Sequence, residues 1–250
     1  MKLAEMTTVE VDQLSRDVVV VIPTGSLEQH GPHLPLFTDS ILATAVSEAV
    51  ERAIPDKVLL LPTVWMGASA HHQAFAGTVS ASMAGYIAAV QDAVRAMTRH
   101  HFTKFFLING HGGNVDPNGV ALREIKAENP DLTVGASNYY TFCESEGEKL
   151  LRGPLKRIRH ACEAETSLML HVAPHLVRLD KAQDGGLVTS PETSGLILHF
   201  DEQTDVGSYG YPSYGTAQVG EALFNAAVTG LVRNLSAIYE GFVLVSRDEG

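Results

Sequence analysis

The segment "GSLEQHGPHLPLFTDS", residues 25–40, concentrates side chains that can bind a metal ion or move a proton. Glu28 and His30 lie two positions apart, so in an extended segment both side chains would point to the same side. Asp39 follows in the same segment, and it could bind a metal or cap the helix predicted after it, because aspartate is a favoured N-cap residue. The segment directly follows "VVVVIPT", which is typical of a buried strand.

A second such segment, "NGHGGN" at residues 109–114, follows another apolar run. Glycines on both sides of His111 permit a compact turn that projects this imidazole inward. We expect Gly112 and Gly113 to lie beside the metal ligands or the substrate. The segment could instead be a tight strand-to-helix turn whose exposed amides bind an anion.

The third segment is "HACEAETS", residues 160–167. If it is helical, Glu165 shares an apolar face with Leu168 and Met169, whereas Glu163 points elsewhere into solvent. A carboxylate on the buried face of a helix is costly unless it is paired or bound to a cation. Glu165 is therefore the candidate ligand of this segment.

Together the three segments offer five candidate metal ligands: Glu28, His30, Asp39, His111 and Glu165. Carboxylate and imidazole ligands without a thiolate favour Zn²⁺ and/or Mn²⁺, with Fe²⁺ as an alternative. Five ligands are too many for one catalytic zinc that keeps an open position. They suit two divalent ions that share one bridging carboxylate.

Apolar runs alternate with helical patterns along most of the chain. Strands are predicted at residues 18–22, 57–64, 104–110 and 132–137. Helices are predicted at 39–54, 82–100, 115–128, 160–173 and 215–242, the last with a possible break. This alternation indicates an α/β fold whose parallel sheet is covered on both faces. Residues 1–250 show no linker, so we expect one domain. The segments that follow the strands should then meet at one end of the sheet.

The composition excludes some classes of partner. The formal charge of −11 argues against nucleic acid and anionic membranes as partners, since both require a basic surface. Cys143 and Cys162 are the only cysteines, which argues against a disulfide framework and favours a reducing compartment. The N-terminus does not have the pattern of a signal peptide, and no apolar run has the length of a membrane span. We therefore expect a soluble, cytoplasmic protein.

The three segments, in this order and with "HHQAFAGTVS" (71–80) between the first two, resemble the creatininase (creatinine amidohydrolase) family. The resemblance implies a three-layer α/β/α domain, a dinuclear metal centre, a hydrolytic reaction and often a homohexamer. It implies that Glu28 and His30 bind one metal ion each and that Asp39 bridges the two.

The resemblance also assigns the remaining roles. His111 would complete the ligands on the Glu28 side and Glu165 those on the His30 side. His160 would be the catalytic acid/base or would stabilise the oxyanion, and Glu165 could share the protonation of the leaving group. Independently of the resemblance, His33 and His72 each lie in a loop of the site and could be hydrogen-bond partners of the ligands or substrate contacts. His71 and His72 could instead be a surface histidine pair.

The sequence departs from creatininase in two places. Creatininase has a motif similar to "N-G-H-x-E-N" at the glycine turn, and the glutamate of this motif is a metal ligand. In the present sequence Gly113 occupies the position of that glutamate. The missing ligand must then be Glu165 or water. Trp65 is the only tryptophan, so the tryptophans that enclose creatinine are missing and creatinine is a doubtful substrate.

The favoured function is hydrolysis of a C–N bond (amide, cyclic amide or formamide) in a small molecule by a hydroxide between the two metals. An alternative is ring opening of a cyclic ketone or lactone at the same site. Less favoured are a nucleophilic Cys162 with His160 as its base and a ligand-binding protein without catalysis. The segment "GSYGYPSYG" (207–215) could be a lid, a subunit contact or an ordinary surface loop.

Overall fold

A parallel four-stranded sheet forms the centre of the computed structural model, which describes residues 1–185 and 195–241. The strands are β1 (Val19–Thr24), β2 (Val58–Leu60), β3 (Lys104–Asn109) and β4 (Thr133–Asn138), in the spatial order β2-β1-β3-β4. Every residue of β1 is buried, as the unbroken apolar run predicts. The predicted parallel sheet is confirmed.

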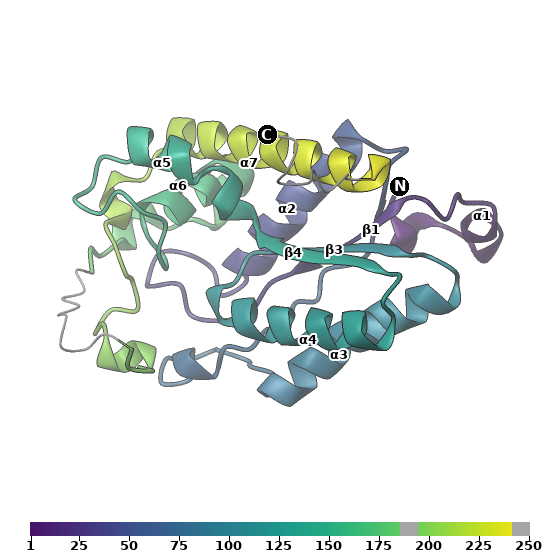
Figure 1. Cartoon of the computed structure of the whole chain (residues 1–250). Coiled ribbons are helices and arrows are strands. Elements are labelled where there is room, and N and C mark those ends of the chain that lie inside the picture. Colours follow the sequence, from purple (N-terminus) through teal and green to yellow (C-terminus); the bar gives the residue numbers. More distant parts are fainter. Residues whose placement is uncertain (186–194, 242–250) are drawn as a thin grey trace, which may run out of the picture.

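Helices cover both faces of this sheet (Figure 1). They are α2 (Thr38–Ala53), α6 (Glu163–Val172) and α7 (Ala217–Glu240) on one face, and α3 (Met83–Arg99) and α4 (Val115–Glu128) on the other. The short helix α1 (Thr8–Asp12) lies beyond the sheet in Figure 1, and α5 (Glu144–Leu150) packs against α7. Val19 and Val21 of β1 belong to the core cluster that includes α2, α6 and α7. Val20 and Ile22 belong to the cluster that includes α3 and α4. Alternate side chains of one strand thus fill two cores, which gives the predicted three layers.

Some elements differ from the sequence-based expectation. β2 ends at Leu60, and pairing with β1 resumes only at a single bridge from Val64 to Thr24. Pro62 lies between them and has no N–H to donate to a strand ladder. The helix expected from residue 160 begins at Glu163 because Ala161 has a φ of 47° and Cys162 is extended.

Other differences lie outside the sheet. The short helices α1 and α5 were not predicted, because each is too short to show an apolar period. Helix α7 runs without a break to Glu240, and residue 242 of the expected helix lies outside the described residues. Within residues 1–185 and 195–241, no helix combines the length and the apolar character needed to cross a membrane.

Helices α6 and α7 pack closely at Gly220, where a Cβ atom would lie 1.9 Å from the carbonyl oxygen of Ser167. This oxygen belongs to the backbone and cannot turn aside, so Gly220→Ala must push α7 away from α6. We expect it to lower the free energy of unfolding by about 2 kcal/mol, the usual scale for overpacking. Gly119→Ala in α4 is the matched control, because its Cβ would meet only a flexible Arg123 side chain at 3.5 Å.

The control should raise stability by about 0.5–1 kcal/mol, because alanine loses less chain entropy than glycine on folding into a helix. Urea unfolding of both variants measures the difference. Equal stability of the two variants would contradict the close contact between α6 and α7.

Candidate metal centre

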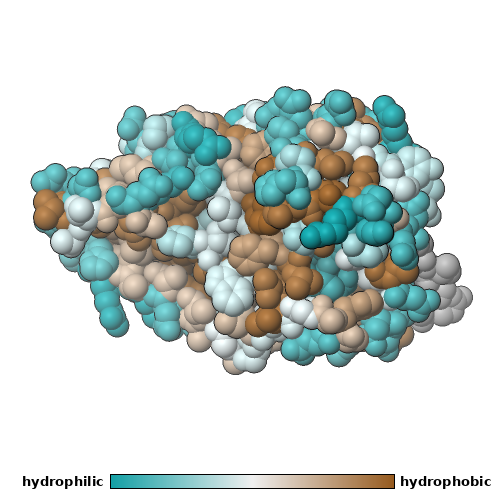
Figure 2. Space-filling model, turned by 180° about the vertical axis from the view of Figure 1, so that it is seen from behind, coloured by the Kyte–Doolittle hydropathy of each residue, from teal (hydrophilic) through white to brown (hydrophobic). Residues whose placement is uncertain are grey.

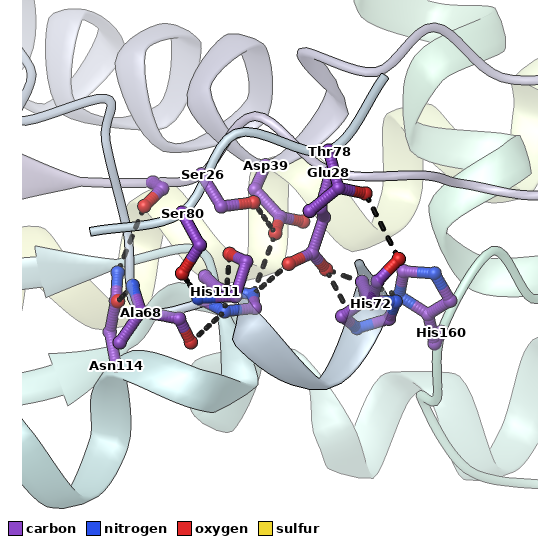
Figure 3. A network of polar contacts seen from close by, with 12 residues as sticks. Ser26, Glu28, Asp39, Ala68, His72, Thr78, Ser80, His111, Asn114 and His160 are labelled. Carbon is purple, nitrogen blue, oxygen red and sulfur yellow. Dashed lines mark hydrogen bonds and ion pairs between the residues drawn. The ribbon is translucent and has the colours of Figure 1, made fainter. Parts of the chain in front are cut away.

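The predicted ligands converge beyond the carboxyl ends of β1 and β3. Glu28 and His30 lie in the loop after β1, Asp39 in the first turn of α2 and His111 directly after β3. Figure 3 shows Glu28, Asp39, His72, His111 and His160 turned toward one another. The five candidate ligands are 0–5% exposed. Parallel strands bring these segments together because their carboxyl ends share one edge of the sheet.

Asp39 lies between two histidines. Its Oδ1 is 3.0 Å from Nε2 of His30 and its Oδ2 is 3.0 Å from Nδ1 of His111. Ser26 Oγ also donates a hydrogen bond to Oδ2 at 2.7 Å. Phe37, not Asp39, occupies the N-cap position of α2, so the capping alternative is wrong. Two oxygens that face two different imidazoles have the arrangement of a bridging carboxylate.

The outer ring nitrogens of these histidines contact backbone carbonyls. Nδ1 of His30 is 3.1 Å from the Glu28 carbonyl oxygen, and Nε2 of His111 is 3.2 Å from that of Ala68. A carbonyl oxygen accepts only, so in each ring the outer nitrogen carries a proton. The inner nitrogens therefore turn toward carboxylates. This is the arrangement in which metal-binding histidines are usually held.

The pKa shifts follow from this arrangement. Burial acts to lower the pKa of His30, but the Asp39 carboxylate opposes it and raises the pKa to about 10. Against the same burial effect, Glu28 and Asp39 raise the pKa of His111. Burial acts to raise the pKa of Asp39, yet the two histidines lower it. The carboxylates of the site thus stabilise a positive charge placed between them and the imidazoles.

The Glu28 carboxylate gives the clearest indication that a bound cation supplies this positive charge. Both of its carboxylate oxygens are buried, and neither makes a hydrogen bond of good geometry: Oε1 lies 3.2 Å from His72 Nε2 and Oε2 lies 3.2 Å from His111 Nδ1. A buried carboxylate that faces only ring nitrogens is stabilised further when a cation binds between them. Its oxygens form one candidate ligand group with Asp39 and His111, and all ligand atoms of this group lie within 4.8 Å of one another. The chemistry of these residues therefore fits a bound metal ion.

Glu165 belongs to a second candidate group with His30 and His160. Burial raises the pKa of Glu165 to about 8. Its Oε2 accepts a hydrogen bond from the Ala161 amide at 2.5 Å. The expectation that Glu163 is solvated is wrong: it is 2% exposed and accepts the backbone N–H groups of Arg152 and Gly153. These two bonds compensate the burial of Glu163 without a metal.

His72 lies closer to the centre than its role as a support implied. It forms a third candidate group with Glu28 and His160, and its Nε2 is 3.2 Å from Glu28 Oε1. Burial lowers the pKa of His72, which keeps the ring neutral. Which of its nitrogens carries the proton depends on Gln29, a residue that the sequence analysis did not single out.

The Gln29 side chain has only one consistent orientation. Its Oε1 accepts from the Gly31 amide, and its Nε2 donates to the Gly207 carbonyl at 3.1 Å. The backbone carbonyl oxygen of Gln29 accepts a hydrogen bond from Nε2 of His160 at 2.8 Å. This His160 nitrogen is therefore protonated and cannot accept a hydrogen bond. The second Nε2 proton of Gln29 therefore goes to His72 Nδ1 at 2.8 Å. This leaves the His72 proton on Nε2 and a lone pair on His160 Nδ1, 3.6 Å from Glu28 Oε1.

Two other predicted residues lie outside the three groups. His33 Nε2 contacts Thr166 Oγ1 at 2.8 Å, which ties the first loop to α6 beside Glu165. Cys162 is buried, and burial raises its pKa to about 12, so the thiol is neutral near pH 7. This opposes a Cys162 nucleophile.

A cavity of about 320 Å³ opens onto the centre. Gly112 and Gly113 are among its lining residues. Five further lining residues have no signal in the sequence: Tyr140, Ile158, Arg159, Phe200 and Gln203. His71 and Tyr209, which also line it, lie in the segments 71–80 and 207–215 noted in the sequence, and Trp65 is not among the lining residues.

Gly113 cannot carry a side chain in this arrangement. A Cβ atom there would lie 2.4 Å from the Ala68 carbonyl oxygen and 2.4 Å from His111 Nε2. We expect Gly113→Ala to displace His111 and to remove at least about half of the bound metal, with about 1–3 kcal/mol lost from the free energy of unfolding. Metal analysis and denaturant unfolding measure both effects.

Gly112→Ala is the control, because a Cβ atom at Gly112 would meet no atom within 4 Å. It should keep the metal content of the native chain. Unchanged metal content in Gly113→Ala would contradict the assigned role of this glycine.

Comparison with known proteins identifies the family of this chain. Residues 4–235 match the family model described as creatinine amidohydrolase. A mycofactocin precursor peptide peptidase of Mycobacterium ulcerans is 32% identical, with 87% of this chain and 84% of that protein covered. The creatinine amidohydrolase of Pseudomonas putida is 30% identical over 90% of both chains. A 3-dehydro-scyllo-inosose hydrolase of Thermotoga maritima is 27% identical, with 69% of this chain and 56% of that protein covered.

Solved structures share the fold. A Bacteroides fragilis protein assigned as a creatinine amidohydrolase superposes with a TM-score of 0.85 at 26% identity, and 98% of each chain is covered. Creatininase structures include a Zn–Zn form of a mutant and a Mn form, with TM-scores of 0.82 and 0.83 at 27% and 28% identity over 96% of this chain and 98–99% of those chains. The candidate ligand groups of this chain are those of a dinuclear metal site.

Proposed function

Because the chain belongs to the creatininase family and is a hydrolase of that family, we propose that it cleaves an amide-type C–N bond in a small molecule with two bound divalent metal ions. Glu28, Asp39 and His111 would hold one ion. His30, Asp39 and Glu165 would hold the other. The observation that carries this proposal is the Asp39 carboxylate, whose two oxygens each face a different buried imidazole at 3.0 Å.

The ions would supply Lewis-acid polarisation of the substrate carbonyl and activation of water. The chain supplies the positions and the proton transfer. Burial lowers the pKa of His160, so its ring is neutral, with a proton on Nε2 held by the Gln29 carbonyl. The lone pair on Nδ1 is then free to take a proton and to pass it to the leaving nitrogen, which is general acid–base catalysis.

The amides of Gly112 and Gly113 are candidates for the oxyanion, because both residues line the cavity beside His111. His72 presents its Nε2 proton toward Glu28 and would fix the orientation of that ligand. His33 supports Glu165 indirectly, through its contact with the neighbouring Thr166. Each predicted site residue thus has a place in one mechanism.

Relatives support the choice of an amide bond. The peptidase and the creatinine amidohydrolase named above match 84% and 90% of their own lengths. The inosose hydrolase matches over a smaller share of the chain, and it keeps ring opening of a cyclic ketone as the second candidate.

The metal assignment is tested with Asp39→Asn. Loss of the shared carboxylate should reduce bound metal from about two ions per chain to fewer than one, and should lower turnover at least about a hundredfold. Asp116→Asn is the control, since Asp116 is likewise an aspartate in the first turn of a helix but is exposed. A native chain that binds no divalent ion, or an Asp39→Asn chain that binds two, would contradict the proposal.

The same preparations are then assayed on a panel of formamides, cyclic amides, short peptides, lactones and cyclic ketones. We expect the chain to hydrolyse one or more of the formamides, cyclic amides or peptides. Chelators should abolish this hydrolysis, and added Zn²⁺ or Mn²⁺ should restore it. Turnover confined to lactones or cyclic ketones would establish the ring-opening alternative instead.

We also propose that copies of the chain associate, as a hexamer according to the family resemblance. One face of the molecule has hydrophobic patches between hydrophilic groups (Figure 2). Exposed large apolar side chains among the described residues include Phe37, Trp65, Met66, Val79 and Met83. Light scattering after gel filtration should give about six times the mass of one chain, and a single-chain mass would refute association. The cytoplasmic location, which the two buried free cysteines support, stays a prediction.

A further inference from the structure

The cavity above the metal centre has one basic side chain. Among the described residues that line it, Arg159 is the only arginine or lysine. It directly precedes His160, whose ring lies 4.3 Å from that of His30. Arg159 therefore lines the same cavity as the candidate ligands, and its side chain is exposed to solvent.

The backbone around Arg159 is fixed from two sides. Its amide contacts the Cys162 sulfur at 3.2 Å, and the Tyr209 amide donates to the His160 carbonyl at 2.7 Å. The guanidinium carbon lies 5.7 Å from the centre of the Tyr209 ring, which also lines the cavity. An arginine held over an aromatic face loses less freedom when it binds a ligand.

The guanidinium donors are not used within the described residues. No aspartate or glutamate there forms an ion pair with Arg159, and its side chain donates none of the hydrogen bonds found there. The carboxylates that line the cavity, Glu28, Asp39 and Glu165, belong to the candidate metal groups instead. Within residues 1–185 and 195–241, no other group occupies the Arg159 guanidinium, which can bind a group of the substrate.

We propose that the substrate carries a carboxylate close to the scissile bond and that Arg159 binds it. The planar guanidinium matches a carboxylate through two parallel hydrogen bonds. N-acyl amino acids and the C-terminal end of a short peptide have this chemistry. A single arginine beside three carboxylates favours a singly charged group over a phosphate dianion. This inference rests on the proposed function, because it names the substrate class of the same site.

The test compares N-formyl and N-acyl amino acids with their C-terminal carboxamides. Arg159→Gln should raise KM for the carboxylates at least about tenfold, because loss of a charge-assisted hydrogen bond costs this factor. KM for the carboxamides and kcat for both should change less than about threefold. Arg159→Lys should recover part of the loss. Arg157→Gln is the control, because Arg157 is exposed like Arg159 and lies two residues away but does not line the cavity.

Equal effects of Arg159→Gln on carboxylates and carboxamides, or no effect on either, would overturn the inference while leaving the proposed function intact. If no amide is hydrolysed, the proposed function fails, and calorimetry decides on Arg159 separately. The probe is N-methylsulfonylglycine, which has no acyl carbon to hydrolyse, added to the metal-loaded chain.

This probe should bind at least about tenfold more weakly to Arg159→Gln than to Arg157→Gln. Equal affinity for the two variants would overturn the inference. Inorganic phosphate is titrated in parallel. If Arg159→Gln lowers the affinity for phosphate more than the affinity for the carboxylate probe, the choice of ligand class is overturned.

Discussion

The contact of one carboxylate with two imidazoles determines the chemistry of this molecule. Asp39 turns each oxygen to a different histidine at 3.0 Å, in a site that is almost fully closed to water. Each imidazole is held from behind by a backbone carbonyl, so its inner nitrogen cannot turn away. Glu28 is also buried, and its oxygens face only ring nitrogens of His72 and His111 at 3.2 Å, so the concentrated negative charge fits the binding of two divalent ions.

The fold is what keeps this contact in place. β1 is buried throughout and lies between β2 and β3, so the loop that carries Glu28 and His30 starts from the most constrained strand. Asp39 is carried by α2, which packs in the core on one face of the sheet, and His111 follows β3 next to β1. Parallel pairing brings these carboxyl ends to one edge and leaves the loops, not the strands, to vary with substrate.

The glycine turn and α6 bring candidate ligands to the centre from two elements, since the turn carries His111 and α6 carries Glu165. At Gly113 any Cβ atom would strike the Ala68 carbonyl, so this turn has no room for an acidic side chain. Glu165 reaches the same centre from α6, and its high pKa shows that burial leaves it in need of a positive neighbour. We propose that Glu165 supplies from α6 the carboxylate that the turn cannot carry, while the turn keeps its close approach to His111.

The sequence by itself determined the parallel α/β fold and the identity of the candidate ligands. Unbroken apolar strands require cover on both faces, and Glu28, His30, Asp39 and His111 each follow such a strand within one short segment. Only the tertiary structure decided how Gln29 orients His72 and His160, that Glu163 is buried, and that Arg159 and Tyr209 line the cavity. Those contacts join residues far apart in the chain, and no local pattern of spacing records which distant groups meet.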